Sequence, residues 1–385
     1  MADLWFWQTV VSPHMAALAS ACAARGHRVT YVAQVAMTED RLRQGWAVPE
    51  MSGVVVRLAG SATAMRQAAK DAVPQAIHLC QGLRGNGLVG VAQRALRKRR
   101  ARQWVVMETV EDSGWRGAIK RLLYRGLFLR WHSHLQGVLA TGWRSVDWVR
   151  AQGMPSHSVF PFAYFLPEAV LPAVQAPPPS DRPFRVLFVG QLIELKRLGL
   201  LLDVLAAVSN KHVPEFSLQV IGSGPLDAEL RAASQRLLGE RVEWMGALPM
   251  HEVRRQMTAA DVLVLPSRYD GWGAVVSEAL MAGTPVIASD ACGSAGVVQA
   301  SGAGGVFCAD DRDALEALLV RAIDAGPWLV PARRALAGWA QCLGAHAGAA
   351  YLERILAHTE GRAAKPLPPW QSDVTGGAES MACVA

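Results

Sequence analysis

The sequence predicts an α/β protein made of two domains, each built on a doubly wound parallel sheet with helices on its faces. In both halves of the 385-residue chain, short apolar runs of strand length alternate with segments of helix length, a pattern typical of parallel sheets. A chain of this length is comfortable for two hydrophobic cores. A Pro-rich region begins at Pro161–Pro167 and includes Pro177–Pro179. We therefore expect a first domain over residues 1–175 and a second over residues 183–340.

The first half is predicted to contain five strands separated by helices. The clearest helix is Pro13–Arg25, a run of small residues that Gly26 ends. The second half repeats the alternation, and its last helix is expected over Ala332–Leu356, with interruptions at glycines. Residues 361–385 are polar and rich in Pro and Gly, so we expect a disordered tail there. The strands of the first half are expected at 4–11, 27–33, 54–58, 76–79 and 103–107, and those of the second at 184–189, 217–221, 242–244, 262–265 and 286–288.

The composition is that of a globular protein, with 51% hydrophobic and 18% charged residues. No apolar run reaches the ~18 residues expected of a membrane-spanning helix. The N-terminus has no basic segment before its short apolar stretch, so it is interpreted as a first strand and not as a signal peptide. The six cysteines form no C-x-x-C pair, which argues against a zinc site and a disulfide framework. A reducing cytoplasm fits this cysteine usage best.

Positive charge is concentrated in the first half of the chain. Residues 1–175 hold 21 Lys and Arg against 10 Asp and Glu, whereas the remainder holds 18 against 22. Two stretches are strongly basic, Arg94–Arg102 and the amphipathic segment Trp115–Gln136. Either could be a core-packed helix with a solvated cationic side. The charge balance of the whole half favours contact with an anionic membrane surface, and hence a cytoplasmic protein held peripherally on the inner face of the membrane.

The segment with the strongest functional signal is residues 267–290. The apolar run Asp261–Pro266 predicts a buried strand, and it is followed by a loop with two glycines and then by a helix. Free backbone N–H groups and the helix dipole favour an anion at such a helix N-terminus. Asp270 in the loop and Glu278 in the helix can accept hydrogen bonds from hydroxyl groups around a bound phosphate. This combination predicts a pocket for a nucleotide sugar.

The same segment resembles the donor-site signature of the GT-B glycosyltransferases of family four, which reads acid, Gly-aromatic-Gly, four residues, acid, then a helix that ends before Gly-x-Pro-Val-Ile. Asp270 stands where glutamate is usual, and Trp272 stands where phenylalanine is usual. The resemblance implies two Rossmann-like domains facing across a cleft, with the nucleotide sugar bound by the second domain and the acceptor by the first. It also implies that a C-terminal helix, over residues 341–360, crosses back to the first domain.

Three further loops follow strands of the second domain, at the sheet edge where open α/β sheets bind ligands. By the resemblance, the first of these loops holds the donor diphosphate through Lys196, although Gln191 replaces the usual arginine. Glu278 is expected at the ribose hydroxyls and Asp270 at the transferred hexose, whereas Trp272 either packs on the sugar or fills the core. The expected donor-binding residues are Gly190, Gln191, Lys196, Gly222, Gly246, Leu248, Asp270, Gly271, Trp272, Gly273, Ser277 and Glu278.

The first domain resembles the family less closely. His14 stands where the first strand is followed by its helix, as either an acceptor-side residue or a helix cap, and Arg84 lies in a glycine-rich stretch that is either a ligand loop or an ordinary connection. Many family members place a histidine after the fifth strand, whereas this chain has Glu108, Glu111 and Asp112 there. The catalytic candidates are Asp270, Lys196, Glu108 and Glu111, and the acceptor-side candidates are His14, Arg84 and Asp112.

Together these features predict a retaining hexosyltransferase that needs no metal ion or other cofactor. It would move a hexose from a nucleotide sugar to a lipid-linked or polysaccharide acceptor in cell-surface glycan synthesis. Another enzyme on the same two-domain plan, such as a sugar-nucleotide epimerase or a phosphorylase, is an alternative, although no pyridoxal-binding lysine pocket is evident. The alternative from another class is nucleic-acid binding through the basic half. Its basic residues lack the interleaved aromatic residues of a base-stacking surface, so no nucleic-acid partner is expected.

Overall fold

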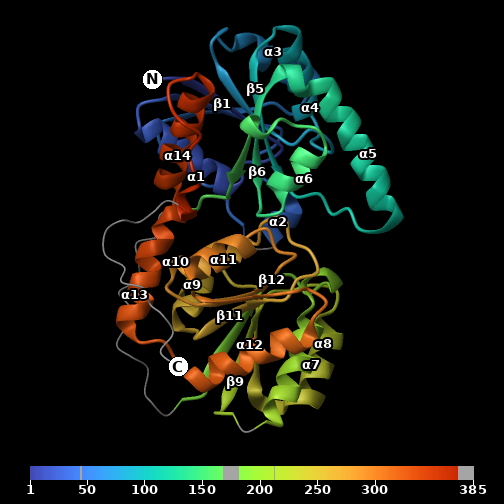
Figure 1. The fold of residues 1–385 in the computed structure, drawn as a ribbon, viewed down its shortest axis with the longest axis vertical. Coiled ribbons are helices and arrows are strands. Elements are labelled where there is room, and N and C mark those ends of the chain that lie inside the picture. The colour runs from blue at the N-terminus through green and yellow to red at the C-terminus, as the bar shows by residue number, and fades with distance from the viewer. Residues whose placement is uncertain (44–45, 168–181, 212, 372–385) are drawn as a thin grey trace.

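The computed structural model describes residues 1–43, 46–167, 182–211 and 213–371, which form two parallel sheets covered by helices (Figure 1). The first sheet has seven strands in the order β3-β2-β1-β4-β5-β6-β7, and the second has six in the order β10-β9-β8-β11-β12-β13. The strand order reverses between β1 and β4 and again between β8 and β11, and such reversal points are where open α/β sheets bind ligands. The predicted α/β fold with two doubly wound sheets is confirmed.

Each half of the chain alternates strands and helices, so the crossovers that parallel pairing requires are helical almost throughout. The first half contains β1 (Asp3–Gln8), α1 (Pro13–Ala24), β2 (Arg28–Ala33), α2 (Glu39–Arg43), β3 (Val54–Leu58), α3 (Ala62–Asp71), β4 (Ile77–Gln81), α4 (Val89–Lys98), β5 (Arg102–Glu108), α5 (Gly114–Trp131), β6 (Leu135–Thr141), α6 (Ser145–Ala151) and β7 (Val159–Phe162). The second contains β8 (Phe184–Val189), α7 (Leu198–Ser209), β9 (Phe216–Ile221), α8 (Asp227–Leu238), β10 (Val242–Gly246), α9 (Met250–Ala259), β11 (Val262–Leu265), α10 (Ala274–Met281), β12 (Val286–Ser289), α11 (Ala295–Ser301), β13 (Gly304–Phe307), α12 (Arg312–Ala325), α13 (Val330–Trp339) and α14 (Ala345–Thr359).

Three strands, β6, β7 and β13, were not predicted. The basic amphipathic segment expected to reach Gln136 ends as a helix at Trp131, and β6 begins at Leu135. β7 contains Pro161, which cannot donate to a ladder, and it is tolerated because β7 is an edge strand. β13 begins with two glycines, and a Cβ at Gly304 would lie 1.9 Å from the Val286 carbonyl oxygen. Each of these three segments contains a glycine or a proline, which interrupts the apolar run by which a strand is predicted.

The chain returns to the first domain through a bend at Gly344. This glycine has ψ 157°, which ends the turn after α13 and starts α14 in a new direction. The long helix expected over Ala332–Leu356 is therefore two helices. α14 packs beside α1 (Figure 1), and the Glu353 carboxylate pairs with Arg25 at 2.6 Å and with His27 at 2.9 Å. At the bend, Leu166 exchanges backbone hydrogen bonds of 3.0 and 2.8 Å with residues 343 and 345.

Part of the predicted disordered tail is ordered. Residues 361–371 lie along the molecule, where the Lys365 ammonium donates to the Val159 carbonyl at 2.8 Å. The Trp370 ring lies 6.5 Å from Phe165 and 6.3 Å from Trp272. The prediction of disorder for these residues is wrong, because local composition does not register the aromatic contacts that Trp370 makes. Residues 372–385 lie outside the described residues, as does position 175, the expected end of the first domain.

Across the described part of the chain, no helix combines the length and the apolar character that crossing a bilayer demands.

A substitution at Gly348 tests the packing of α14. A Cβ there would lie 2.3 Å from the Phe165 ring, so Gly348→Ala should destabilise the protein by about 1–3 kcal/mol through overpacking. Gly338 in α13 is the matched control, because nothing lies within 4 Å of the corresponding Cβ. Gly338→Ala should be neutral or stabilise the protein by up to about 1 kcal/mol. Denaturant unfolding measures both, and equal effects would contradict the packing described here.

Candidate functional site

The carboxyl ends of β8, β9 and β10 form a surface lined by glycines. The Gly190 N–H donates to the Ile221 carbonyl at 3.0 Å, and the Gly222 N–H donates to the Gly246 carbonyl at 2.8 Å. A Cβ at Gly222, where φ is +145°, would lie only 1.8 Å from the Gly190 carbonyl oxygen. Glycine is therefore required for these loops to approach one another, and the result is exposed backbone at the strand ends, where a ligand can lie close to it.

Beside this surface, the loop after β11 carries Asp270 and leads into α10. Gly273 takes a left-handed conformation, φ 81°, immediately before the helix, and the first N–H groups of a helix have no partners within it. The Lys196 ammonium lies 2.5 Å from the Asp270 carboxylate, and both side chains are largely buried. A cation, a carboxylate and a helix N-terminus therefore lie together, a combination suited to an anionic ligand that also carries hydroxyl groups.

Glu278 is buried within α10 and has no hydrogen-bond partner among the residues that the structure describes. Burial raises the pKa of its carboxyl to about 7, although Arg254 opposes the shift. Trp272 and Ser277 are also buried, and the Trp272 indole N–H donates to the Ser277 hydroxyl at 3.2 Å. Of the two roles considered for Trp272, packing in the core is therefore the one observed. Ser277 holds that ring in place.

The first domain contains a cavity of about 150 Å³ at the carboxyl ends of β1, β4 and β5. The His14 ring stacks on Tyr164 with centroids 5.2 Å apart, and its edge meets Trp46. Burial, with a smaller effect of Arg41, lowers the pKa of His14 to about 4, so this imidazole is neutral at pH 7. The cavity is lined by Gln8, Val10, Ser12, His14, Met15, Arg41, Trp46, Gln81, Val106, Glu108 and Tyr164.

Glu108 lies where this cavity meets residues 266–273 of the second domain, the loop that the sequence predicts to bind a donor and that is called the donor loop below. One carboxylate oxygen accepts a hydrogen bond from the Tyr164 hydroxyl at 2.5 Å. The other lies so close to Gly271 that a Cβ there would be 1.9 Å away. Burial raises the pKa of Glu108, the Tyr164 hydrogen bond lowers it, and the nearby Asp270 charge raises it further. Of the three acids at and after the end of β5, Glu108 is therefore the one that contacts both the cavity of the first domain and the donor loop of the second.

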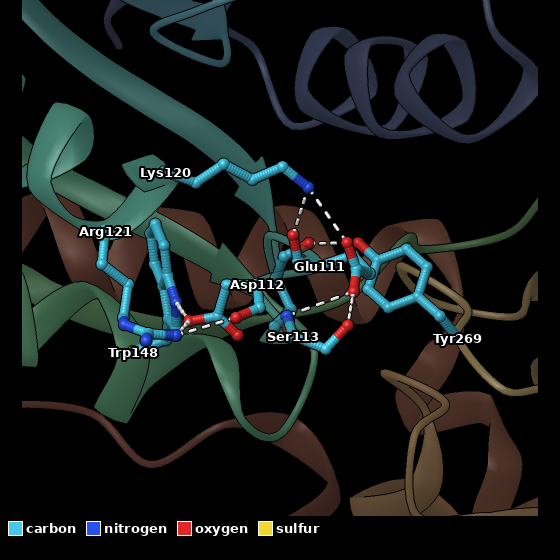
Figure 2. Close-up of polar contacts among 8 residues, drawn as sticks. Glu111, Asp112, Ser113, Lys120, Arg121, Trp148 and Tyr269 are labelled. Atoms are coloured by element: carbon cyan, nitrogen blue, oxygen red, sulfur yellow. Dashed lines mark hydrogen bonds and ion pairs between the residues drawn. The ribbon is translucent and has the colours of Figure 1, made fainter. Parts of the chain in front are cut away.

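Glu111 and Asp112, the other acids of that loop, are engaged elsewhere (Figure 2). The Glu111 carboxylate accepts from Ser113 and lies 3.0 Å from the Lys120 ammonium, and these hydrogen bonds lower its pKa to about 2. Asp112 pairs with Arg121 at 3.0 Å and accepts from the Trp148 indole N–H at 2.9 Å. Neither acid lines the cavity.

The other predicted site residues are either glycines, which contribute only backbone, or side chains at the surface or against the core. Arg84 and Gln191 are exposed, and Leu248 packs against the core. Two tyrosines at the site were not predicted. Tyr164 lies in the aromatic run that was interpreted as a domain boundary, and Tyr269 precedes Asp270 and donates to the Thr109 carbonyl of the first domain. Each of these tyrosines lies next to a loop predicted from the sequence, and that position could have identified them as candidate site residues.

The loop after β6 contacts the loops after β11 and β12 through its backbone and through the Trp143 side chain. The Trp143 backbone N–H donates to the Gly293 carbonyl at 2.9 Å, and its indole N–H donates to the Asp290 carbonyl at 3.0 Å. A Cβ at Gly142 would lie 3.1 Å from the Gly271 carbonyl oxygen, and one at Gly293 would lie 2.0 Å from it. The end of β6 is therefore held against the second domain by the Trp143 hydrogen bonds and the approach of Gly142 to Gly271, and Glu108 lies against Gly271 at the end of β5.

Comparison with known proteins finds a family model that the second domain matches. Residues 173–335 match the family model described as glycosyl transferases group 1. The amylovoran biosynthesis glycosyltransferase AmsK of Erwinia amylovora is 29% identical over 147 residues, which are 36% of this chain and 36% of that protein. Alignments with the first three curated relatives span only 26% to 38% of the length of those proteins.

Solved structures extend the likeness to the whole fold. The apo form of the lipopolysaccharide outer core galactosyltransferase WaaB has a TM-score of 0.68 at 16% identity, with 93% of this chain and 99% of that one covered. The UDP complex of Anabaena HepE also has a TM-score of 0.68 at 16% identity, with 93% and 100% covered. The predicted GT-B architecture is therefore confirmed.

The raised pKa of Glu278 predicts a pH-dependent cost to stability. The unfolded chain releases this proton near pH 4.5 and the folded chain near pH 7. The stability associated with the protonated acid is therefore complete below pH 4.5 and is lost as the pH rises to 7. In thermal unfolding of the free protein, Glu278→Gln should raise Tm relative to the parent by an amount that grows over this window and is constant above it.

Glu353→Gln is a control of opposite sign. Hydrogen bonds from Arg25 and His27 hold the pKa of Glu353 below its ordinary value. This variant should therefore have a lower Tm at neutral pH, with a difference that shrinks on acidification. A constant Tm difference between Glu278→Gln and the parent from pH 4.5 to 7 would contradict the assignment of a raised pKa to Glu278.

Proposed function

We propose that the protein is a glycosyltransferase that moves a hexose from a nucleotide-sugar donor to a lipid-linked or polysaccharide acceptor in cell-surface glycan synthesis. The observation that carries the proposal is the Lys196–Asp270 pair beside glycine-lined strand ends, with Glu278 buried in the helix that follows the Asp270 loop. These residues lie in the range that matches the group 1 glycosyltransferase model. HepE has been crystallised with UDP and with UDP-glucose, which supports a nucleotide sugar as the donor.

The charges at the donor loop suit a diphosphate and a sugar together. In the free protein Asp270 holds the Lys196 ammonium. When a donor enters, the ammonium turns to the diphosphate oxygens, and Asp270 accepts hydrogen bonds from hexose hydroxyls. Lys196 then stabilises the charge that develops on the leaving diphosphate. In the proposed reaction this cation takes the part that a metal ion would otherwise take, so no metal or other cofactor is needed.

Glu278 completes the donor site through the nucleotide ribose. Its carboxylate has no hydrogen-bond donor among the described residues, so bound ribose hydroxyls supply the donors that burial otherwise denies it. Donor binding should therefore favour the ionised form of Glu278. The cost of ionising this buried acid in the free protein is recovered only when the ligand is present.

The cavity of the first domain suits an acceptor sugar. Trp46 and His14 offer ring faces or edges, and Arg41, Gln81 and Glu108 supply hydrogen-bonding groups for hydroxyls. Glu108, at the contact between the domains, lies next to the place where the hexose carbon and the acceptor hydroxyl must meet.

Transfer with retention of configuration fits this arrangement. The acceptor oxygen bonds to the anomeric carbon as the bond to the diphosphate breaks, and the acceptor proton passes to the departing phosphate on the same face of the sugar. An acceptor of the lipid-linked class would be presented at the inner face of the membrane, so we place the protein in the cytoplasm, peripherally bound there.

Thermal-shift measurements with UDP-, GDP- and ADP-hexoses test the donor class, because a ligand that binds the native state raises Tm in proportion to its affinity. One series should raise Tm markedly. Product analysis by NMR then reports the anomeric configuration, and turnover should be unchanged by EDTA. Failure of every nucleotide sugar to shift Tm would overturn the proposal, and EDTA-sensitive turnover would overturn its metal-independent form.

Replacing Lys196 tests the leaving-group role. Lys196→Ala should lower kcat by about 10²–10³-fold, the usual effect of removing one preorganised stabilising group, with a smaller effect on donor affinity. Lys211, which pairs with Glu316 at 2.6 Å on the surface of the same domain, gives the matched control. Lys211→Ala should retain full turnover. A Lys196→Ala enzyme with the kcat of the parent would remove this residue from the site.

Replacing Glu108 tests the acid at the domain contact. Glu108→Gln preserves the side-chain volume and should leave nucleotide-sugar affinity nearly unchanged while lowering kcat at least tenfold. Because the pKa of Glu108 is raised, the acidic limb of the parent's pH–rate profile should disappear in the variant. Glu111→Gln is the comparison variant. If Glu111→Gln lowered kcat more than Glu108→Gln does, the catalytic role would belong to Glu111.

A further inference from the structure

Helix α5 has large apolar side chains on two opposite faces. Tyr124, Phe128 and Trp131 pack into the core of the first domain. On the other side, Trp115, Leu122 and Leu129 are 71%, 70% and 63% exposed. Figure 1 shows α5 along the outer margin of the first domain, with no described element covering that outer side. Isolated exposed leucines are common in soluble proteins, but a set on one helix indicates an interaction surface.

The exposed residues form one continuous ridge. Trp115, Ile119, Leu122 and Leu129 are separated by intervals of four, three and seven residues, which place them above one another on one face of a helix. Ile119 is exposed like the other three. The ridge runs for nearly the whole of α5, which spans Gly114–Trp131. None of these four side chains belongs to a hydrophobic core cluster formed by the described residues, so packing in the core does not explain why they are apolar.

Arginines border the ridge, and no acidic residue interrupts it. α5 contains Arg116, Arg121, Arg125 and Arg130, all exposed, and its sequence has no Asp or Glu. At 100° per residue, Arg121 and Arg125 fall on one side of the ridge and Arg116 and Arg130 on the other. An apolar line between two cationic borders matches the cross-section of a lipid monolayer with anionic headgroups, where apolar side chains enter and cations stay at the headgroups.

We propose that α5 is the membrane-docking element of this protein and lies flat on an anionic lipid surface. Trp115, Ile119, Leu122 and Leu129 enter the boundary between headgroups and acyl chains. Arg116, Arg125 and Arg130 bind the headgroups, whereas Arg121 is held by Asp112. This inference deepens the proposed function, because a lipid-linked acceptor is presented at such a surface. The first 175 residues carry 21 cationic against 10 acidic side chains, so the long-range field of this half of the chain also draws it to anionic lipid.

The other basic stretch, Arg94–Arg102, serves the fold instead. The apolar side of α4 is buried through Val89, Ala92 and Leu96. The Arg97 guanidinium lies over the Trp131 ring at 5.2 Å. Arg99 donates to the Ala69 carbonyl and, at 3.0 Å, to the Ala72 carbonyl, and Arg102 pairs with Glu360. The apolar side of this stretch is thus buried, and three of its six cations have protein partners. The membrane contact expected at both stretches is therefore assigned to α5 alone.

The contacts in Figure 2 connect α5 to the candidate site. The Lys120 ammonium donates to the Glu111 carbonyl at 2.5 Å, and the Arg121 guanidinium donates to the Asp112 carbonyl at 2.8 Å. The same loop begins after Glu108, and its Thr109 carbonyl accepts from Tyr269 of the donor loop. Docking through α5 therefore holds the acid at the domain contact at a fixed position relative to the lipid surface.

Vesicle sedimentation of the full chain tests this proposal without any substrate. The parent should bind vesicles of phosphatidylcholine with phosphatidylglycerol, should bind pure phosphatidylcholine weakly, and should lose binding as salt rises, since charges are screened over about 8–10 Å at ordinary ionic strength. The double variant Leu122→Gln with Leu129→Gln should bind the anionic vesicles at least tenfold more weakly. Arg125→Gln with Arg130→Gln should weaken binding to anionic vesicles and reduce its salt dependence.

The matched control is Leu329→Gln with Leu367→Gln, two leucines that are 72% and 60% exposed outside α5. This pair should bind vesicles within twofold of the parent, and all variants should keep the parent's Tm and its turnover on a soluble acceptor. A parent that does not bind anionic vesicles, or an α5 variant that binds like the parent, overturns the proposal. So does a parent dimer in sedimentation equilibrium that the α5 leucine variant dissociates, because the ridge would then be a subunit interface. Vesicle binding without hexose transfer would refute the proposed function and leave the docking surface intact.

Discussion

The arrangement of the two domains depends on how closely their backbones approach at two glycines. A Cβ at Gly142 of the first domain would lie 3.1 Å from the Gly271 carbonyl oxygen, and a Cβ at Gly271 of the second domain would lie 1.9 Å from the Glu108 carboxylate. A larger residue at either position would separate the ends of β5 and β6 from the donor loop. Since Glu108 and Asp270 come close to one another only across this contact, the absence of these two side chains determines which charged groups form the site.

The charged groups at the candidate site are a largely buried ion pair and two buried acids. Lys196 and Asp270 neutralise each other, whereas Glu278 and Glu108 are buried acids with raised pKa values. Buried acids of this kind are costly to keep ionised. They are typical of sites where a bound substrate supplies the missing hydrogen-bond donors, and less typical of structural positions. Glu108 lines a cavity that a substrate can occupy, and Glu278 lies in the helix that follows the Asp270 loop.

The sequence predicted the second domain more fully than the first, for physical reasons. The strands β8 and β11 are buried on both faces, so they appear as uninterrupted apolar runs, and both were predicted to the residue. The loop with Asp270 and the position of Glu278 followed from glycine spacing, which is local. The role of Glu108 could not be separated from those of Glu111 and Asp112, because that depends on which acid α5 engages. Likewise, α5 has apolar residues on both faces, and a sequence alone does not say which face the core takes.

The bend at Gly344 has a mechanical consequence. The described chain passes between the domains at Leu166, at residues 343–345 and again near Trp370, and these passes lie together. Leu166 is bonded to both sides of the bend, so the passes cannot slide independently. Rotation of one lobe relative to the other would therefore centre on these segments. The opposite border of the domain contact would then open most, and a ligand bound between the lobes would enter and leave from that side.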